Sequence, residues 1–282
     1  MQLKVAGPRS KVIIGCQGWN YDDWTTSDPV SPVFYPRGTK SADMLGLYSR
    51  AFDSTEIDST FYAIPPASNI EKWFDRTPES FTFSPKMPQE ITHELRLGEN
   101  SFPPLEEFCE RVRGLGAKLA VCLVQLPPFF EANRENAVSL RKFLERLPRD
   151  IRFAVEFRRR EWFVDWTFEE LGKHGIVPAV VEGKWVPNEI MFDAASRVRG
   201  EFSYVRFMGE RDLTSFDRIW RDRTGHLELW AQLISSIETD STYVYFSNLY
   251  EGHAPESCRK LAGFLGCDSV DPASLDDQRA LF

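Results

Sequence analysis

The chain has 282 residues, of which 42% are hydrophobic and 27% are charged, values typical of a globular protein. Its formal net charge of −8 argues against a protein that binds nucleic acid nonspecifically through a basic surface. No apolar run approaches the roughly 20 residues of a membrane-spanning helix, and the first eleven residues lack the hydrophobic core of a secretory signal, so we expect a cytoplasmic protein without membrane contact.

Short apolar or β-branched segments alternate with amphipathic segments, a pattern that predicts strands alternating with helices. The expected strands cover residues 12–16, 54–58, 81–86, 119–126, 152–157, 176–182, 203–208 and 242–248. The expected helices cover residues 41–52, 67–76, 103–113, 133–147, 166–173, 226–238 and 255–265. Residues 17–40 read as a long polar and aromatic loop after the first strand, and segment 183–200 shows no clear amphipathic helix.

This alternation predicts a parallel sheet, and about eight repeats favour a closed TIM (β/α)8 barrel. An open doubly wound sheet is the alternative topology. We find no linker or composition boundary, so residues 1–282 are expected to form a single domain. The dinucleotide-binding and P-loop glycine patterns follow none of the strands, and no cofactor is predicted.

The cysteines form an odd, scattered set without a C-x-x-C pair. They are Cys16, Cys109, Cys122, Cys258 and Cys267. We interpret them as reduced thiols and expect no zinc site built from cysteine. Cys16 ends the first strand, but no activating base for a thiol nucleophile is evident, and the G-x-S-x-G motif is absent.

Charged and amide side chains fall near the C-terminal end of nearly every later strand. In the stretch STEIDSTFYAIP, Glu56 and Asp58 lie two residues apart, so a strand would turn both carboxylates to one face. The other members of this set are Lys86, Gln125, Glu156, Arg158, Glu182, Arg206 and Asn248. The carboxyl ends of barrel strands form the mouth that holds active sites, so we expect these side chains to converge there.

Two interpretations of the set remain open. Each polar residue could simply begin a solvated loop, or the whole set could neutralise itself as an internal charge network. Charges left unpaired in an enclosed mouth would cost on the order of several kcal/mol. If the charges do not neutralise one another, a bound ligand would have to compensate those that remain.

Several motifs together resemble the YecE-like family, also called domain of unknown function 72. They are GCQGWNYDDW at 15–24, FYP at 34–36, STEIDSTFYAIP at 54–65, FTFSPKMPQEITH at 81–93, LVQLPP at 123–128, AVEFRRREW at 154–162, YVRFMG at 204–209 and FSN at 246–248. The resemblance covers nearly the whole chain and implies a fold similar to TIM barrels. It implies no established activity.

The chain departs from the pattern of that family at four places. Members commonly carry Asn at Asp58 and His at Arg159 and Met208, and their paired asparagines appear here as Ser247 and Asn248. Methionine at 208 removes an acid/base group, so a mechanism that requires that histidine does not operate in this chain.

Paired carboxylates suit acid/base chemistry, in which one is held protonated and the other stays ionised. We therefore predict Glu56 or Glu156 as the catalytic acid or base, with Asp58 and His93 as further catalytic candidates. Arg158, two residues from Glu156, could instead tie that acid into a salt bridge.

The carboxylates and His93, together with Glu182, also have the ligand mix of a divalent metal site. Three nearby cations oppose such a site, so no metal ligands are assigned, and a divalent metal is left open. Two other histidines, His174 and His226, fall in or beside helices and are expected to face solvent.

Lys86, Arg158 and Arg206 are the predicted receptor for a phosphate or carboxylate, because guanidinium groups bind such anions through paired hydrogen bonds. Gln125 and Asn248 would orient the ligand. The aromatic residues predicted to cover or stack on it are Trp19, Tyr21, Tyr62 and Trp162. A hydrophobic plug that holds the first loop over the barrel is the alternative for the aromatic set.

The pattern therefore indicates an enzyme that acts on a small anionic or polyhydroxylated molecule at the barrel mouth. Its reaction class, whether hydrolase, lyase or isomerase, is left open, as is the oligomeric state. The alternative is a protein that binds nucleic acid, or acts like an abasic-site endonuclease, through the same aromatic and cationic groups. That alternative predicts a steep dependence of binding on salt.

Overall fold

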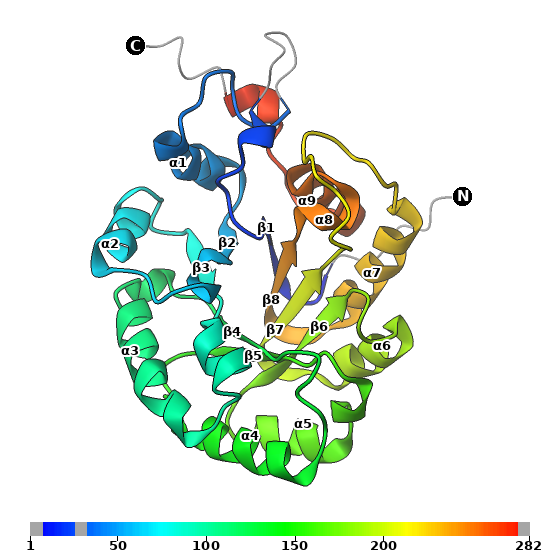
Figure 1. The fold of residues 1–282 in the computed structure, drawn as a ribbon. Coiled ribbons are helices and arrows are strands. Elements are labelled where there is room, and N and C mark those ends of the chain that lie inside the picture. Colours follow the sequence, from blue (N-terminus) through cyan, green and yellow to red (C-terminus); the bar gives the residue numbers. More distant parts are fainter. Residues whose placement is uncertain (1–7, 26–32, 276–282) are drawn as a thin grey trace.

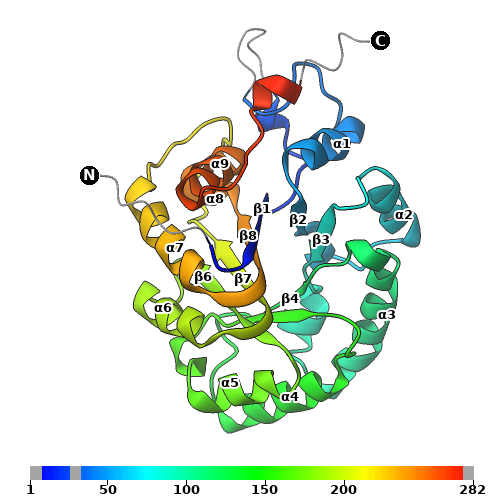
Figure 2. The same ribbon diagram turned by 180° about the vertical axis from the view of Figure 1, so that it is seen from behind.

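The computed structural model describes residues 8–25 and 33–275. Parallel strands lie at the centre, and helices surround them (Figures 1 and 2). The strands are β1 (Lys11–Cys16), β2 (Ser54–Ile57), β3 (Thr82–Pro85), β4 (Cys122–Gln125), β5 (Phe153–Glu156), β6 (Val177–Glu182), β7 (Arg199–Phe207) and β8 (Glu238–Phe246). Continuous hydrogen bonding joins β1-β8-β7-β6-β5-β4 in one sheet and β2-β3 in a second.

Two seams join these sheets into a ring. The pair Gln17 and Glu56 bridges β1 to β2, and Lys86 and Leu123 bridge β3 to β4 in the same parallel sense. The chain order of the strands is therefore also their order around the ring. This confirms the predicted TIM barrel, and the open doubly wound sheet is wrong.

Helices follow the strands and cover the outside of the ring (Figure 1). They are α1 (Ser41–Ala51), α2 (Ala67–Asp75), α3 (Phe102–Arg113), α4 (Arg134–Arg146), α5 (Asp165–Gly172), α6 (Asn188–Arg197), α7 (Thr224–Ser236), α8 (Asn248–Glu251) and α9 (Ala254–Leu265). Across the part of the chain that the structure describes, none of them combines the length and apolar character needed to cross a bilayer.

The expectation that segment 183–200 lacks a helix was wrong. Helix α6 begins at Asn188, directly after Pro187, and it buries Met191, Ala194 and Ala195 against the barrel. Two alanines and one methionine make a narrow apolar stripe, which is weaker in the sequence than a row of leucines. The predicted loop at 17–40 contains a 3₁₀ turn at Asp22–Trp24, and its residues 26–32 lie outside the described residues.

Strands β7 and β8 both begin four residues earlier than predicted. Their first residues, Arg199 and Glu238, are exposed and pair with each other across the two strands. The hydrophobic pattern on which the prediction depended starts only where the strands enter the barrel.

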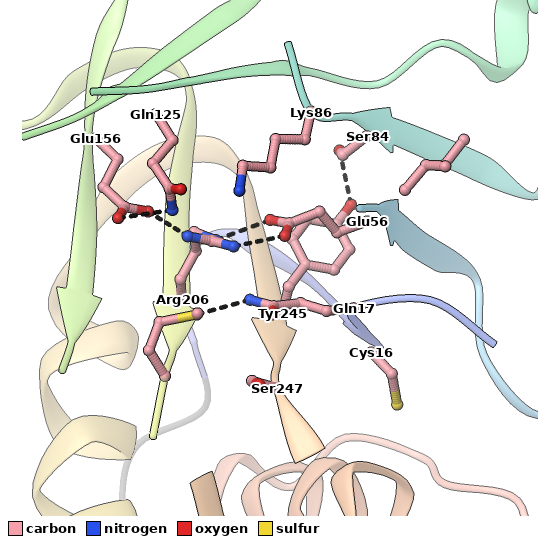
Figure 3. A network of polar contacts seen from close by, with 12 residues as sticks. Cys16, Gln17, Glu56, Ser84, Lys86, Gln125, Glu156, Arg206, Tyr245 and Ser247 are labelled. Carbon is pink, nitrogen blue, oxygen red and sulfur yellow. Dashed lines mark hydrogen bonds and ion pairs between the residues drawn. The ribbon is translucent and has the colours of Figure 1, made fainter. Parts of the chain in front are cut away.

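Hydroxyl groups fill the middle of the barrel. The Tyr245 hydroxyl lies 2.6 Å from Ser54 Oγ and 2.9 Å from Ser84 Oγ, so it links β8 to β2 and β3 across the interior. All three side chains are buried. Figure 3 shows the contact between Ser84 and Tyr245 close to Glu56.

The seam between β1 and β2 depends on a close approach at Gly15. There the Tyr48 hydroxyl accepts a hydrogen bond from the Cys16 N–H (2.7 Å) and donates one to the Ser54 carbonyl (3.0 Å). A Cβ atom on Gly15 would lie 2.0 Å from that same carbonyl oxygen. Only glycine lets the two strands approach closely enough for Tyr48 to bridge them.

We predict that Gly15→Ala lowers the free energy of unfolding by about 2–3 kcal/mol, because the added methyl group meets backbone that cannot move freely. Urea unfolding followed by circular dichroism measures the change. The matched control is Gly263→Ala in α9, where a Cβ atom meets nothing within 4 Å. That change should raise stability by up to about 1 kcal/mol. Equal effects at the two positions would contradict the seam argument.

Candidate functional site

A cavity of about 540 Å³ opens at the carboxyl ends of the strands. Ten of the thirteen predicted site residues contribute to its wall. They lie at the ends of seven different strands or in the loops that follow those strands. They are Tyr21, Asp58, Tyr62, Lys86, His93, Gln125, Glu156, Arg158, Arg206 and Asn248. The predicted convergence of polar residues at one end of the barrel is thus present in the structure.

The floor of the cavity is an ion network centred on Arg206 (Figure 3). The guanidinium donates from Nε to Glu56 Oε2 (2.9 Å) and from Nη2 to Glu56 Oε1 (2.7 Å), a two-point contact. Its Nη1 donates to Glu156 Oε2. Arg206 is 1% exposed. Burial acts to lower the pKa of Arg206, but Glu56 and Glu156 raise it above its ordinary value.

Glu56 lies below the cavity and contributes nothing to its wall. Its side chain has no exposed surface. Besides the two bonds from Arg206, its Oε2 accepts a hydrogen bond from the Tyr204 hydroxyl (2.7 Å). Both carboxylate oxygens are therefore occupied. These contacts give Glu56 the role of holding Arg206, and not the predicted acid/base role.

Glu156 is held in the same way on the opposite side of Arg206. Its Oε1 accepts from Gln125 Nε2 (2.9 Å) and from Arg158 Nε (2.9 Å). Burial would raise the pKa of Glu156, but Arg206 and Arg158 outweigh it and lower the pKa to about 2. The carboxylate stays ionised near neutral pH, so it cannot donate a proton there as a general acid.

Asp58 and Lys86 both border the cavity, and neither forms an ion pair with a described residue. Burial and the neighbouring Glu56 raise the pKa of Asp58. Burial, together with the positive charge of Arg206, lowers the pKa of Lys86 to about 7. Both groups can therefore exchange a proton closer to neutral pH than their unperturbed forms do.

His93 lies at the edge of the cavity in a π-helical turn, Glu90–Glu94. Its Nδ1 is 2.9 Å from Thr92 Oγ1, and its ring packs edge-on against Phe61 with a centroid distance of 5.0 Å. Burial and the charge of Lys86 lower the pKa of His93 to about 4. The imidazole is therefore neutral at physiological pH.

The acids and histidines considered for a metal do not gather. Glu182 takes no part in the cavity wall. Its oxygens instead contact the Tyr250 hydroxyl (3.0 Å) and His226 Nδ1 (3.0 Å). Across residues 8–25 and 33–275, no three His, Cys, Asp or Glu side chains are placed to hold a metal ion. Cofactor content stays a prediction from the sequence.

Two of the predicted aromatic contacts are wrong. Trp19 packs edge-on against Trp73 and Phe83 (5.9 and 6.3 Å between centroids) and takes no part in the cavity wall. Trp162 is buried, with its Nε1 donating to the Phe130 carbonyl (2.9 Å). Trp19 thus anchors the first loop to the barrel, as the plug interpretation expects, whereas Trp162 packs between the loops that follow β4 and β5. Tyr62, in contrast, is 71% exposed at the rim.

Sequence reasoning missed several wall residues that lie in loops. Trp185 and Lys184 follow β6, and Arg211 follows β7. Gln17 follows β1, and its Nε2 donates to Met208 Sδ (2.9 Å), which ties the first and seventh strand ends together. A polar residue directly after a strand was a usable signal for Gln17, whereas the later loop residues carry no periodic pattern.

We predict that Arg206→Met lowers the free energy of unfolding by about 3–5 kcal/mol, because it leaves two buried carboxylates without a counter-ion. Adding Glu56→Gln to that variant should recover part of the loss. Arg199→Met, at the exposed start of the same strand, is the control and should change stability by less than about 1 kcal/mol. Similar losses at Arg206 and Arg199 would show that the network is not needed for stability.

Comparison with known proteins gives relatives along nearly the whole chain. The chain is 28% identical to UPF0759 protein YunF of Bacillus subtilis (strain 168), over 94% of this chain and 99% of that protein. It is 23% identical to UPF0759 protein YecE of Escherichia coli (strain K12), over 87% of this chain and 89% of that protein. These relatives agree with the resemblance found in the sequence.

Solved structures show the same fold. A DUF72 family protein of Thermotoga maritima, TM1631, is 25% identical with a TM-score of 0.72, over 91% of this chain and 99% of that chain. PbGH5A of Prevotella bryantii, a glycoside hydrolase family 5 enzyme, is 8% identical with a TM-score of 0.51, over 94% of this chain and 100% of that chain, and shares the fold alone. Residues 13–279 match the family model described as "Protein of unknown function DUF72", and this chain therefore belongs to that family.

Proposed function

We propose that the protein is an enzyme that binds a small anionic molecule in the barrel mouth and moves a proton on it with Asp58. The observation that carries this proposal is the charge of the cavity wall. Five cationic side chains and two carboxylates contribute to it, although the whole chain has a net charge of −8. They are Lys86, Arg158, Lys184, Arg206 and Arg211, against Asp58 and Glu156.

Arg158 supports anion binding most directly. Its Nε is engaged by Glu156, while its two Nη nitrogens have no hydrogen-bond partner among the described residues. The side chain keeps 18% of its surface exposed, and its Cζ lies 5.7 Å from the centroid of the Trp185 ring. A guanidinium held by one edge presents its other nitrogens to a carboxylate or phosphate.

Asp58 is the carboxyl that supports acid/base chemistry. Glu56 and Glu156 each accept three hydrogen bonds from neighbouring donors, whereas Asp58 borders the cavity and has a raised pKa. A carboxyl that borders the ligand cavity and has a raised pKa suits general acid/base catalysis better than one that is fully hydrogen-bonded. His93, neutral at the same edge, could accept a hydrogen bond but carries no charge.

Amide groups would orient polar atoms of the ligand. Asn248 is 3% exposed, and its Oδ1 accepts hydrogen bonds from Trp24 Nε1 (3.1 Å) and the Ala254 N–H (3.0 Å). Its Nδ2 is buried with no acceptor among the described residues. Because an unsatisfied buried donor costs free energy, an oxygen of a bound ligand would compensate it. Gln125 borders the same cavity.

The nucleic-acid alternative is favoured by one observation at the rim. Trp185 is 44% exposed, with Lys184 Nζ 4.8 Å and Arg158 Cζ 5.7 Å from its ring centroid. Aromatic rings next to cations are typical of single-strand binding. A fluorescence titration with a single-stranded oligonucleotide separates the two functions, since nucleic-acid binding weakens steeply with salt.

For the small-anion proposal, we predict that glycerol 3-phosphate binds in calorimetry whereas glycerol does not. Arg158→Met should weaken that binding by about 10- to 100-fold, the value of a charged hydrogen bond. Arg159→Met is the matched control, because Arg159 pairs with Glu131 and takes no part in the cavity wall. Equal binding of glycerol and its phosphate, or equal loss in both variants, would refute the proposal.

We also predict a pH dependence from Lys86. Its amine loses its positive charge as pH rises through about 7, so the affinity for sulfate, which stays fully ionised, should fall by about tenfold between pH 6 and 8. Lys86→Arg keeps its charge over this range and should flatten that part of the profile. An unchanged profile in the variant would show that Lys86 does not cause the pH dependence.

A further inference from the structure

Lys86 has a fixed backbone and a side chain that extends into the cavity. It directly follows β3, its N–H donates to the Ile57 carbonyl (3.1 Å), and its carbonyl accepts from the Thr60 hydroxyl (2.7 Å). From this anchored position the side chain extends toward the Arg206 network (Figure 3). The amine is thus held at the floor of the cavity by a rigid strand end.

The surroundings of this amine differ from those of a structural lysine in the same chain. Lys118 is also buried, with 3% of its surface exposed against 9% for Lys86, and its ammonium donates hydrogen bonds to the carbonyls of Phe74 and Thr77. Lys86 Nζ lies 3.6 Å from the centroid of the Phe61 ring and has no hydrogen-bond acceptor among the described residues. The face of the ring attracts an ammonium, but it provides none of the hydrogen bonds that hold Lys118.

Burial, together with the positive charges that face Lys86, keeps a substantial share of the amine neutral near pH 7. Arg206 and Arg158 oppose its protonation, whereas Glu156 and Glu56, which favour it, are already bonded to those arginines. Burial is the largest factor, and the resulting pKa is about 7. A neutral lysine amine in a shielded pocket is the form that attacks carbonyl carbon.

We propose that Lys86 is a nucleophile that forms an imine with the carbonyl carbon of a small anionic aldehyde or ketone. The inference rests on the proposed function, because the cations of the cavity wall would hold the carboxylate or phosphate of that compound. It adds the substrate class, an anionic carbonyl compound, and the atom to which the substrate becomes bonded.

The reaction balances without any further reagent. The lone pair of Nζ forms a bond to the carbonyl carbon, and the C=O π bond breaks as its electron pair moves to oxygen. The oxygen takes up a proton and the nitrogen loses one, which gives the carbinolamine. A second proton transfer to the hydroxyl group releases water and leaves the iminium ion. Asp58 borders the same cavity, and the positive charge of Lys86 lowers the pKa of Asp58, so the carboxyl is placed to exchange these protons.

The test is reductive trapping on the whole protein. Cyanoborohydride delivers hydride to the iminium carbon and converts the imine to a stable secondary amine, which peptide mass spectrometry locates. The probes are pyruvate, glycolaldehyde phosphate and, as a neutral comparison, glycolaldehyde. We expect the two anionic probes to label Lys86 at least about tenfold more than Lys184, which borders the same cavity. Labelling should increase from pH 6 to 8, and sulfate should suppress it.

Lys86→Arg, which keeps the cation but removes the nucleophile, should abolish the adduct at this position. Labelling that follows surface exposure, or that is equal for glycolaldehyde and its phosphate, would overturn the inference. So would the absence of any adduct at Lys86. If glycerol 3-phosphate still binds in an Arg158-dependent manner, only the imine fails. If that binding is also absent, the proposed function fails with it.

Discussion

A guanidinium without access to water must have its charge matched, and this constraint organises the mouth of the barrel. Arg206 on β7 is matched by Glu56 on β2 and Glu156 on β5, strands that lie on different sides of the ring. Breaking either contact would leave a buried charge uncompensated, which costs far more than an exposed ion pair gains. The network therefore ties three sides of the barrel together and gives the cavity a rigid floor.

The same network determines which groups remain free to act on a ligand. Its carboxylates are occupied, so the negative charge that would otherwise attract Lys86 is already bonded to arginines. Lys86 is left with a lowered pKa, and Asp58, beside the buried charge of Glu56, is left with a raised one. Both shifts bring proton exchange toward neutral pH. Because Glu56 and Glu156 are paired with arginines, Lys86 and Asp58 stay unpaired within the described part of the chain and can exchange protons with a ligand.

Period-two alternation and polar strand ends were enough to predict the barrel and the convergence of the site. They could not predict which of these side chains border the cavity and which lie buried below it. Glu56 lies within β2, which ends at Ile57, whereas Asp58 follows the strand with helical backbone angles (φ −81°, ψ −21°). The two acids therefore do not share a strand face as predicted, and only Asp58 borders the cavity. Trp19 and Trp162 lie in the predicted loops, but they contact Trp73 and Phe130 instead of the cavity. Loop conformation, which decides such directions, has no periodic signal in a sequence.

The energetic position of Lys86 supports the chemical role that we propose for it. Its pKa is lowered from the ordinary 10.5 to about 7, so below pH 7 the buried ammonium destabilises the fold by about 5 kcal/mol. Between pH 7 and 10.5 the unfolded chain binds more protons than the native one, and the free energy of unfolding rises with pH. A methionine would fill the same space without this penalty. Residues that oppose folding at a rigid, enclosed position are expected where function requires them, and Lys86 is such a residue.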